Sequence, residues 1–194
     1  MSKSVLGTKT NSKYIPKAFL KAEKVVKYAA ENPDKLFMMK LKSNRGVKLV
    51  KPELMNFTAT ASIKDYFAQE FIKNPLLWNG HKFDFSIFVA ITSVDPLRLY
   101  YYEKTINLRF CSKPYSIEDP DDVGSYVIGS EHISGQNFGP VKKYVTNGYT
   151  NKEAFENFMR SKGANLTEIW LKAEDLIRSI TMGKEQSMID GVSF

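Results

Sequence analysis

Apolar residues in the first 110 positions of the chain gather in short runs, which is typical of β-strands. We interpret six of these runs as strands: residues 36–39, 47–50, 66–72, 83–91, 97–102 and 106–110. The run 83–91 alternates only in part between apolar and polar residues, which favours a strand buried on both faces. Residues 93–96 have the composition of a turn, and the strands that follow suggest a meander.

Helical spacing of apolar residues is found near the beginning of the chain and again near its end. The early helix has one apolar face, made by Ala22, Val25, Val26 and Ala29. Pro16 suits its first turn, and Asn32-Pro33 ends it. A short helix is predicted over 152–159 and a longer one over 166–182, whose apolar stripe includes Trp170 and belongs to the core. Asn165 with Glu168 resembles a capping box.

The segment from Cys111 to Tyr144 shows little periodicity and is rich in Gly, Ser, Asp and Pro. We expect a long loop region there. We also expect residues 1–13 to be loose and residues 183–194 to carry no clear element. Strands dominate the first part of the chain and helices the last part, which is the pattern of an α+β protein.

Composition limits the class of protein. The chain has 194 residues, of which 43% are hydrophobic and 25% charged, and a single cysteine. One cysteine excludes an internal disulfide framework and indicates a reducing compartment. The net charge of +7 favours acidic partners such as a nucleotide, a nucleic acid or an acidic protein segment, although lysines that only solvate helix faces give the same total. No signal peptide and no apolar run long enough to cross a bilayer is evident.

Candidate phosphate contacts lie at the end of the first predicted strand. Lys40 can keep its stem buried there while its amine reaches a phosphate, and a solvated strand-end lysine is the alternative. In the polar loop 42–46, Arg45 and backbone amides can also contact phosphates, although any hairpin loop has a similar composition.

A second set of charged residues follows the turn-rich segment 74–81. Lys82 and Asp84 are predicted to lie on the same face of a strand. Beside a hinge they fit a nucleotide site, and a simple ion pair explains them equally well. Arg109 lies between two apolar residues and needs a carboxylate or a phosphate as partner.

Other reactive side chains form no recognisable arrangement in the sequence. His81 and His132 are isolated and lack metal-ligand spacing, and no catalytic triad is evident. Cys111 has no recognisable nucleophile context.

The segment from Gln69 to Asp84 contains Gln-Glu-Phe-Ile, Asn-Pro-Leu-Leu and Gly-His-Lys-Phe-Asp, and residues 92–100 are Thr-Ser-Val-Asp-Pro-Leu-Arg-Leu-Tyr. These runs resemble the tubulin–tyrosine ligase-like family, which has Gln-x-Tyr-Ile, Asn-Pro-Leu-Leu, Gly-x-Lys-Phe-Asp and Thr-Ser-x-Asp-Pro-Leu-Arg-Ile-Tyr. Further likenesses are Arg109-Phe110, the segment 146–152, Lys40 with residues 44–46, and the Leu-Trp helix around Trp170.

The resemblance implies an ATP-grasp fold, in which two α+β lobes with mainly antiparallel sheets clamp ATP. It places a central lobe at 14–73 and an incomplete C-terminal lobe at 74–182, without the closing strands that carry the family's metal ligands. It also implies ATP-dependent ligation of an amino acid, such as glutamate, glycine or tyrosine, to a protein carboxylate through an acyl-phosphate. The usual target is a tubulin tail, so we expect a cytoplasmic, microtubule-associated protein. Mg²⁺ would be held by residues beyond this chain.

The resemblance also assigns roles to single residues. Arg109 matches the arginine that receives the incoming amino acid, and is the candidate catalytic residue. The implied nucleotide contacts are Lys40, Arg45 and Gly46 at the phosphates, Gln69, Glu70, Phe71 and Ile72 as the adenine hinge, Lys82 and Asp84 at the nucleotide and its ribose or metal, and Thr146 and Asn147 as a second contact.

Two departures from the family pattern keep a second interpretation open. Ser86 stands where the family has an arginine that serves phosphate and acyl-phosphate, and the family's lysine ahead of the last helix is not evident near residues 163–165. We therefore expect a fragment or truncated isoform of a longer ligase, or a non-catalytic module that binds tubulin or another acidic protein. A nucleic-acid-binding domain is the weaker third interpretation, because no RNA-binding pattern surrounds residues 100–102.

Overall fold

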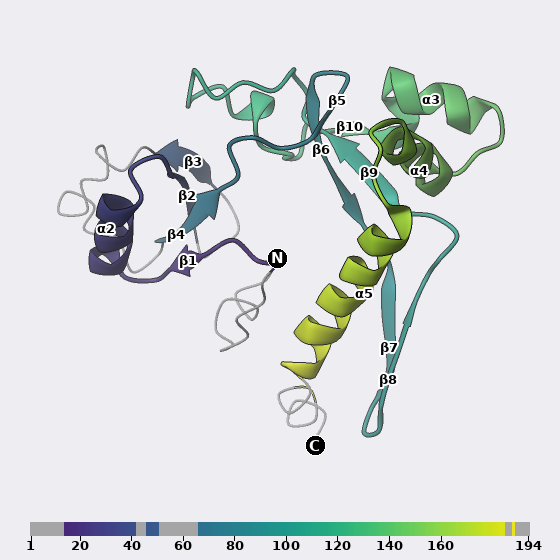
Figure 1. The fold of residues 1–194 in the computed structure, drawn as a ribbon, viewed down its shortest axis with the longest axis horizontal. Coiled ribbons are helices and arrows are strands. Elements are labelled where there is room, and N and C mark those ends of the chain that lie inside the picture. The colour runs from purple at the N-terminus through teal and green to yellow at the C-terminus, as the bar shows by residue number, and fades with distance from the viewer. Residues whose placement is uncertain (1–13, 42–45, 51–65, 185–187, 189–194) are drawn as a thin grey trace. The chain divides into compact units, whose positions relative to one another are not determined.

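A computed structural model describes residues 14–41, 46–50, 66–184 and 188 of the chain. Its helices and antiparallel sheets (Figure 1) confirm the predicted α+β class. The chain forms two compact units, Met1–Pro75 with Ser116–Val123 and Leu76–Tyr115 with Gly124–Phe194. The predicted loose N-terminus, Arg45 and most of the predicted tail lie outside the described residues. In the described ranges, no helix combines the length and the apolar character needed to cross a membrane.

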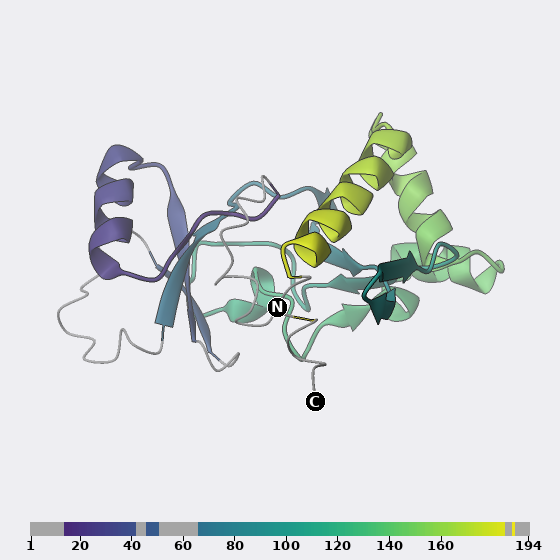
Figure 2. The same ribbon diagram turned by 90° about the horizontal axis from the view of Figure 1, so that it is seen from below.

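The first unit is built on a four-stranded antiparallel sheet. In the order β1-β4-β2-β3 its strands are β1 (Ala18–Phe19), β4 (Tyr66–Phe71), β2 (Leu36–Leu41) and β3 (Val47–Val50). Helix α2 (Ala22–Glu31) covers one face of this sheet (Figure 2). Val25 and Ala29 are buried there against Phe37 and Ala68, so the other face of the sheet is the one that carries Lys40.

The expectation for Pro16 is wrong, whereas the helix after it is confirmed. Ala18 and Phe19 pair with β4 as a short edge strand, so the chain is still extended after Pro16 and the helix begins only at Ala22. The helix ends before Asn32, as predicted. Its buried stripe is narrower than expected, because Val26 is 50% exposed.

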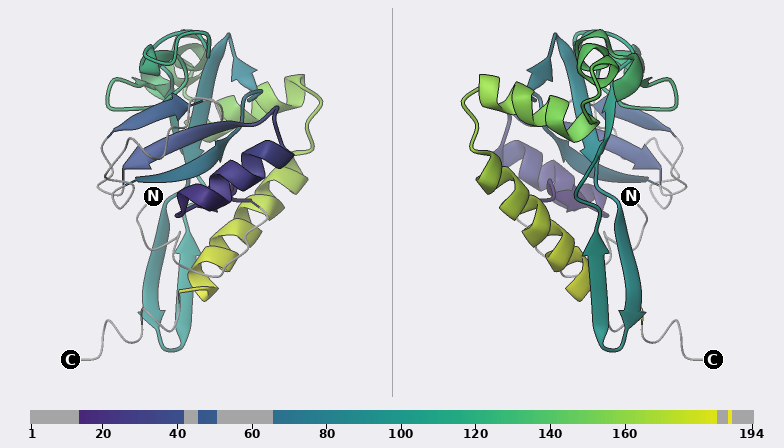
Figure 3. Two further views of the ribbon diagram at one scale, coloured as in Figure 1. Left: turned by 90° about the vertical axis from the view of Figure 1, so that its left-hand side faces the viewer. Right: turned by 90° about the vertical axis from the view of Figure 1, so that its right-hand side faces the viewer.

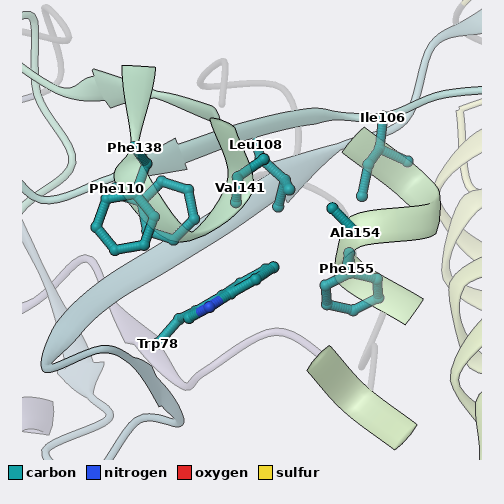
Figure 4. Close-up of a cluster of buried hydrophobic side chains, with 8 residues drawn as sticks. All are labelled: Trp78, Ile106, Leu108, Phe110, Phe138, Val141, Ala154 and Phe155. Carbon is teal, nitrogen blue, oxygen red and sulfur yellow. The ribbon is translucent and has the colours of Figure 1, made fainter. Parts of the chain in front are cut away.

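The second unit has a four-stranded sheet with helices on one side. Its strands, in the order β10-β9-β6-β5, are β10 (Ile133–Ser134), β9 (Asn107–Phe110), β6 (His81–Ser86) and β5 (Leu77–Trp78). The helices are α3 (Gly139–Thr146), α4 (Asn151–Ser161) and α5 (Leu166–Met182). Aromatic and aliphatic side chains from the strands and from α3 and α4 form one buried cluster (Figure 4). Ile169 and Trp170 of α5 pack against it, which confirms that the Trp170 stripe belongs to the core.

The predicted strand 83–91 is two strands, which corrects both its burial and the meander. β6 ends at Ser86, and a hairpin of β7 (Val89–Val94) and β8 (Leu97–Tyr101) projects from the sheet (Figure 3). β9 pairs with β6 and not with β8. The hairpin is therefore an insertion between two paired strands, and its apolar residues stay exposed, for example Ile91 at 42%. A hydrogen bond from the Tyr101 hydroxyl to Glu174, 2.8 Å long, ties the hairpin to α5.

The region predicted as a long loop also contains regular elements. Besides β10 it holds two short 3₁₀ turns, η3 (Val123–Ser125) and η4 (Gly135–Asn137), and helix α3. Pro140 lies in the first turn of α3, and Val141, Tyr144 and Val145 supply its apolar side toward the core. The helical spacing of these apolar residues was the signal available in the sequence. It was overlooked because two lysines stand between them.

Replacing Thr150 with alanine should destabilise the second unit by about 1 kcal/mol, because Thr150 is the N-cap of α4. Its hydroxyl accepts a hydrogen bond from the Glu153 amide, while the Glu153 carboxylate accepts from the Thr150 amide at 2.7 Å. Urea unfolding measures the loss. Thr167→Ala is the matched control, since Thr167 is exposed within α5. Equal effects of the two variants would contradict a capping role.

Candidate functional site

Lys40 and Gln69 lie together on the face of the first sheet that α2 does not cover. The Lys40 Nζ donates a 2.7 Å hydrogen bond to the Gln69 Oε1, and the Gln69 Nε2 donates to the carbonyl oxygen of Pro16 at 3.1 Å. Gln69 is thus held from one side and presents its oxygen to the lysine. Two residues of the predicted nucleotide site, 29 positions apart in sequence, are brought together here.

Burial lowers the pKa of Lys40 below its ordinary value. A lysine in this state is short of solvent. Among the described residues its partner is the neutral Gln69 amide, so a phosphate oxygen would be a better counter-charge than these surroundings supply. Gly46, just before β3, lies close by, because its neighbour Val47 pairs with Lys40 across the sheet. Gly46 has a φ of 88°, which a residue without a Cβ adopts at little cost.

The lowered pKa of Lys40 gives a pH-dependent stability with a definite sign. Between the folded pKa and the unfolded value of 10.5, the unfolded chain binds more protons at this position, so the free energy of unfolding rises with pH in that window. Relative to Lys40→Met, the wild-type chain should therefore gain stability as the pH is raised from neutral toward 10.5. Urea unfolding of both proteins across this range is the measurement. A difference that does not vary with pH would show that Lys40 is not desolvated.

The predicted adenine hinge continues from Gln69 along β4. The Glu70 carboxylate is held on the other face of the sheet, 2.8 Å from the Lys35 Nζ and 3.2 Å from the Tyr28 hydroxyl that donates to it. Phe71 is buried and is the last residue of β4 to pair with β2. Ile72 follows outside this ladder and is 60% exposed. Glu70 and Phe71 therefore hold the strand in place, while Ile72 is accessible.

In the second unit, Asp84 and Arg109 form a two-pronged ion pair. They face each other across β6 and β9. The Arg109 Nε donates to the Asp84 Oδ1 at 2.9 Å, and the Arg109 Nη2 donates to the Asp84 Oδ2 at 2.7 Å. The carboxylate partner expected for Arg109 is thus Asp84. Both side chains are partly exposed, at 32% for Arg109 and 39% for Asp84, so the pair adds little stability but fixes the direction of the guanidinium.

The sheet of the second unit has a polar face opposite its apolar core. Phe83 and Phe85 of β6 and Leu108 and Phe110 of β9 belong to the core or pack against it. Because side chains alternate along a strand, Asp84 and Arg109 lie on the other face. Ser134 of β10 is paired with Arg109 in register, so it lies on this face as well. The sequence reasoning missed Ser134, because a two-residue strand leaves no periodic signal.

Lys82 is positioned by a backbone carbonyl. Its Nζ donates a 2.9 Å hydrogen bond to the carbonyl oxygen of Tyr126, whose side chain is fully buried. The buried Cys111 lies near this lysine, and burial raises the pKa of its thiol to about 11. The thiol is therefore protonated at neutral pH, which agrees with its lack of a nucleophile context. Tyr126 itself was missed because it lies in the segment predicted as loop.

Thr146 and Asn147 lie at the C-terminal end of α3, and both are exposed. This helix packs on the apolar face of the sheet through Val141 and Tyr144. The two residues therefore belong to the helical side of the second unit, whereas Asp84 and Arg109 lie on its polar side. Their role in nucleotide binding stays a prediction.

The described residues fit a nucleotide better than they fit a metal. Lys40 and Gln69, with the exposed Ile72 at the end of β4, offer a cation, an amide and an accessible backbone. Within the described ranges, no three His, Cys, Asp or Glu side chains lie close enough together to hold a metal ion.

Comparison with known proteins identifies the group to which the sequence belongs. The model of the tubulin-tyrosine ligase family matches residues 7–193. The chain belongs to the tubulin-tyrosine ligase family. Its α+β architecture agrees with the ATP-grasp-like fold of that family, as the resemblance predicted.

Several members of the family are similar over more than half of this chain. "Probable tubulin polyglutamylase ttll-15" of Caenorhabditis elegans is 32% identical over 192 residues, which cover 97% of this chain and 37% of that protein. "Tubulin polyglutamylase TTLL6" of Mus musculus is 28% identical over 137 residues, which cover 69% of this chain and 15% of that protein. "Tubulin monoglutamylase TTLL4" of Homo sapiens is 29% identical over 128 residues, which cover 60% of this chain and 10% of that protein. The chain thus spans 37% or less of the length of these relatives.

Proposed function

We propose that this chain is the nucleotide-binding part of an ATP-dependent ligase that joins an amino acid to a protein carboxylate on tubulin. The reaction would proceed through an acyl-phosphate, with glutamate, glycine or tyrosine as the amino acid. The observation that carries the proposal is the partly buried Lys40 held by Gln69, in a chain of the tubulin-tyrosine ligase family. The named relatives are tubulin glutamylases, which favours glutamate. The proposal places the protein in the cytoplasm, in association with microtubules.

Each part of the proposed site has a separate task. Lys40, with Arg45 and Gly46, would bind phosphates, and the backbone from Gln69 to Ile72 would bind the adenine. ATP would supply the phosphate that activates the carboxylate, which is difficult to join to an amine directly. Lys82 and Asp84 would orient the nucleotide, and Thr146 and Asn147 would add a further contact.

Arg109 would receive the carboxylate of the incoming amino acid. A guanidinium has five N–H donors, and Asp84 engages two of them. The remaining donors are enough for a second carboxylate, whose approach Asp84 would direct by holding the guanidinium still.

A non-catalytic function is the second candidate, and one position favours it. Ser86 lies two residues after Asp84 on the same strand, and its hydroxyl cannot supply the charge of the arginine that the family has there. A chain with this change could keep the fold and bind tubulin or another acidic protein through its basic surface without ligating anything.

Titration calorimetry of the 194-residue chain with Mg-ATP tests the nucleotide site. We expect saturable binding of one ATP per chain, with no heat from Mg²⁺ alone. Absence of ATP binding by a folded chain, together with co-sedimentation with microtubules, would overturn the ligase proposal in favour of the non-catalytic module.

A further inference from the structure

A pocket of about 610 Å³ opens on the helical side of the second unit. Its lining residues come from the turn that joins β5 to β6, the first two turns of α3 and the end of α4; Figure 1 shows where these three elements are in the ribbon. Every described residue that lines it belongs to the second unit. The pocket is separate from the polar face that carries Asp84 and Arg109, because α3 and α4 pack on the opposite side of the sheet.

The inner wall of the pocket is aromatic and rigid. Trp78 and Phe158 both line it and stack with their ring centres 4.2 Å apart and their planes 5° apart. Trp78 is 6% exposed and is fixed edge-on by Phe110 and Phe138 (Figure 4). Among the described residues, the Trp78 indole N–H has no acceptor. The N–H is also not completely enclosed by the protein.

The outer wall supplies further hydrogen-bond donors and positive charge. Lys143 lines the pocket directly, and the Lys162 Nζ lies 5.6 Å from the centre of the Phe158 ring. The Asn157 Oδ1 accepts a 3.0 Å hydrogen bond from Arg160, so the amide N–H groups of Asn157 remain as its donors. Asn79 lines the rim, held at a φ of 49° in the turn.

No acidic residue among those the structure describes lines this pocket. The acid nearest to it along α4 is Glu156, and its carboxylate is already engaged. It lies 3.9 Å from the Lys152 Nζ and 3.6 Å from the Arg160 Nη2, and it accepts a 2.9 Å hydrogen bond from the Trp170 indole. The pocket therefore combines donors, cations and aromatic surface without a competing negative charge, which is the chemistry that captures a carboxylate on a flexible side chain.

We infer that this pocket is a docking site for an acidic peptide, in which a glutamate or aspartate side chain enters between Trp78 and Lys143. The aromatic wall would pack against the methylene groups of the side chain, and the donors would bind its carboxylate. This function goes beyond the proposed ligase reaction, because it needs neither nucleotide nor Arg109. It would hold an acidic chain on the surface away from the polar face.

Fluorescence anisotropy of a labelled glutamate-rich peptide with the 194-residue chain, without nucleotide, tests this inference. Lys143→Glu should weaken binding by at least about fivefold, since it reverses a charge in the pocket. Lys142→Glu is the matched control, because it makes the same charge change at the adjacent exposed residue, which does not line the pocket. Its affinity should stay near that of the wild type.

A neutral variant separates the pocket from general attraction by a basic protein. Gly139 lines the pocket, and a Cβ built there meets no atom within 4 Å. Gly139→Leu should therefore fill the pocket, keep the melting temperature and abolish peptide binding. A peptide with glutamine in place of glutamate should not bind.

Three outcomes would overturn the inference. They are equal losses for Lys142→Glu and Lys143→Glu, unchanged affinity of Gly139→Leu, and binding of tripolyphosphate in competition with the peptide at equal strength, which would indicate a general anion site. Because nucleotide is left out, a failure here leaves the ligase proposal standing, and a failure of ATP binding leaves this one standing.

Discussion

Phe110→Ala should destabilise the second unit by about 3 to 5 kcal/mol, the range for removing a large buried aromatic ring. Phe110 is fully buried, and its ring lies 3.8 Å from that of Phe138 in a stacked arrangement and 5.8 Å from that of Trp78. It belongs to the strand that carries Arg109. The cavity left by alanine would therefore loosen both the core and the polar face above it.

Urea unfolding followed by tryptophan fluorescence measures this loss, because Trp78 reports on the same cluster. Phe88→Ala is the control: Phe88 is 57% exposed, and its replacement should change the free energy of unfolding by less than about 1 kcal/mol. If both variants lower the free energy of unfolding by the same amount, Phe110 does not belong to the core as described. The first unit has its own sheet and helix, so hydrogen exchange should show its protection kept in Phe110→Ala.

Lys40→Met should weaken ATP binding by at least about tenfold, the lower end of what a charge-assisted hydrogen bond to phosphate contributes. Methionine keeps the length and the apolar stem of the side chain, so the fold should be retained. Removing the ammonium group also removes a partly buried charge, so the variant should be at least as stable as the wild type at neutral pH. Stability and affinity would then change in opposite directions, which a merely structural lysine would not produce.

Lys48→Met is the matched control for this prediction. Lys48 lies on the adjacent strand β3 and pairs in register with Met39, so its side chain is on the opposite face from Lys40. It is 65% exposed and lies 3.3 Å from Asp121. Titration calorimetry with Mg-ATP should show wild-type affinity for Lys48→Met. Equal weakening by both variants would mean that the lysines act only through net charge.

The sequence predicted the elements whose signal is local. β3 and α5 have the predicted limits, because Val47–Val50 is a compact apolar run and Leu166–Met182 keeps a regular stripe. The likeness to the family was carried by Gln69–Asp84 and was confirmed, since such a run is specific whatever the surrounding structure.

The features that were missed depend on contacts between distant residues. β6 pairs with β9 and brings Phe83 opposite Phe110, although a hairpin is inserted between the two strands in the sequence. No local sequence pattern predicts this pairing. The bond between Lys40 and Gln69 required the register of two strands. The Asn79-Gly80 turn, with φ values of 49° and 78°, does not depend on distant residues, because Asn-Gly is itself a local sequence signal for a tight hairpin.

Incorporation of an amino acid into tubulin by the full natural protein tests the central claim most directly. Purified tubulin would be incubated with labelled glutamate, glycine or tyrosine, with and without ATP, and its tails analysed by mass spectrometry. We predict ATP-dependent addition of glutamate to tail carboxylates, lost in Arg109→Ala and Lys40→Met and kept in Lys48→Met. No addition of any of the three amino acids, by a protein that still binds ATP and microtubules, would contradict the account.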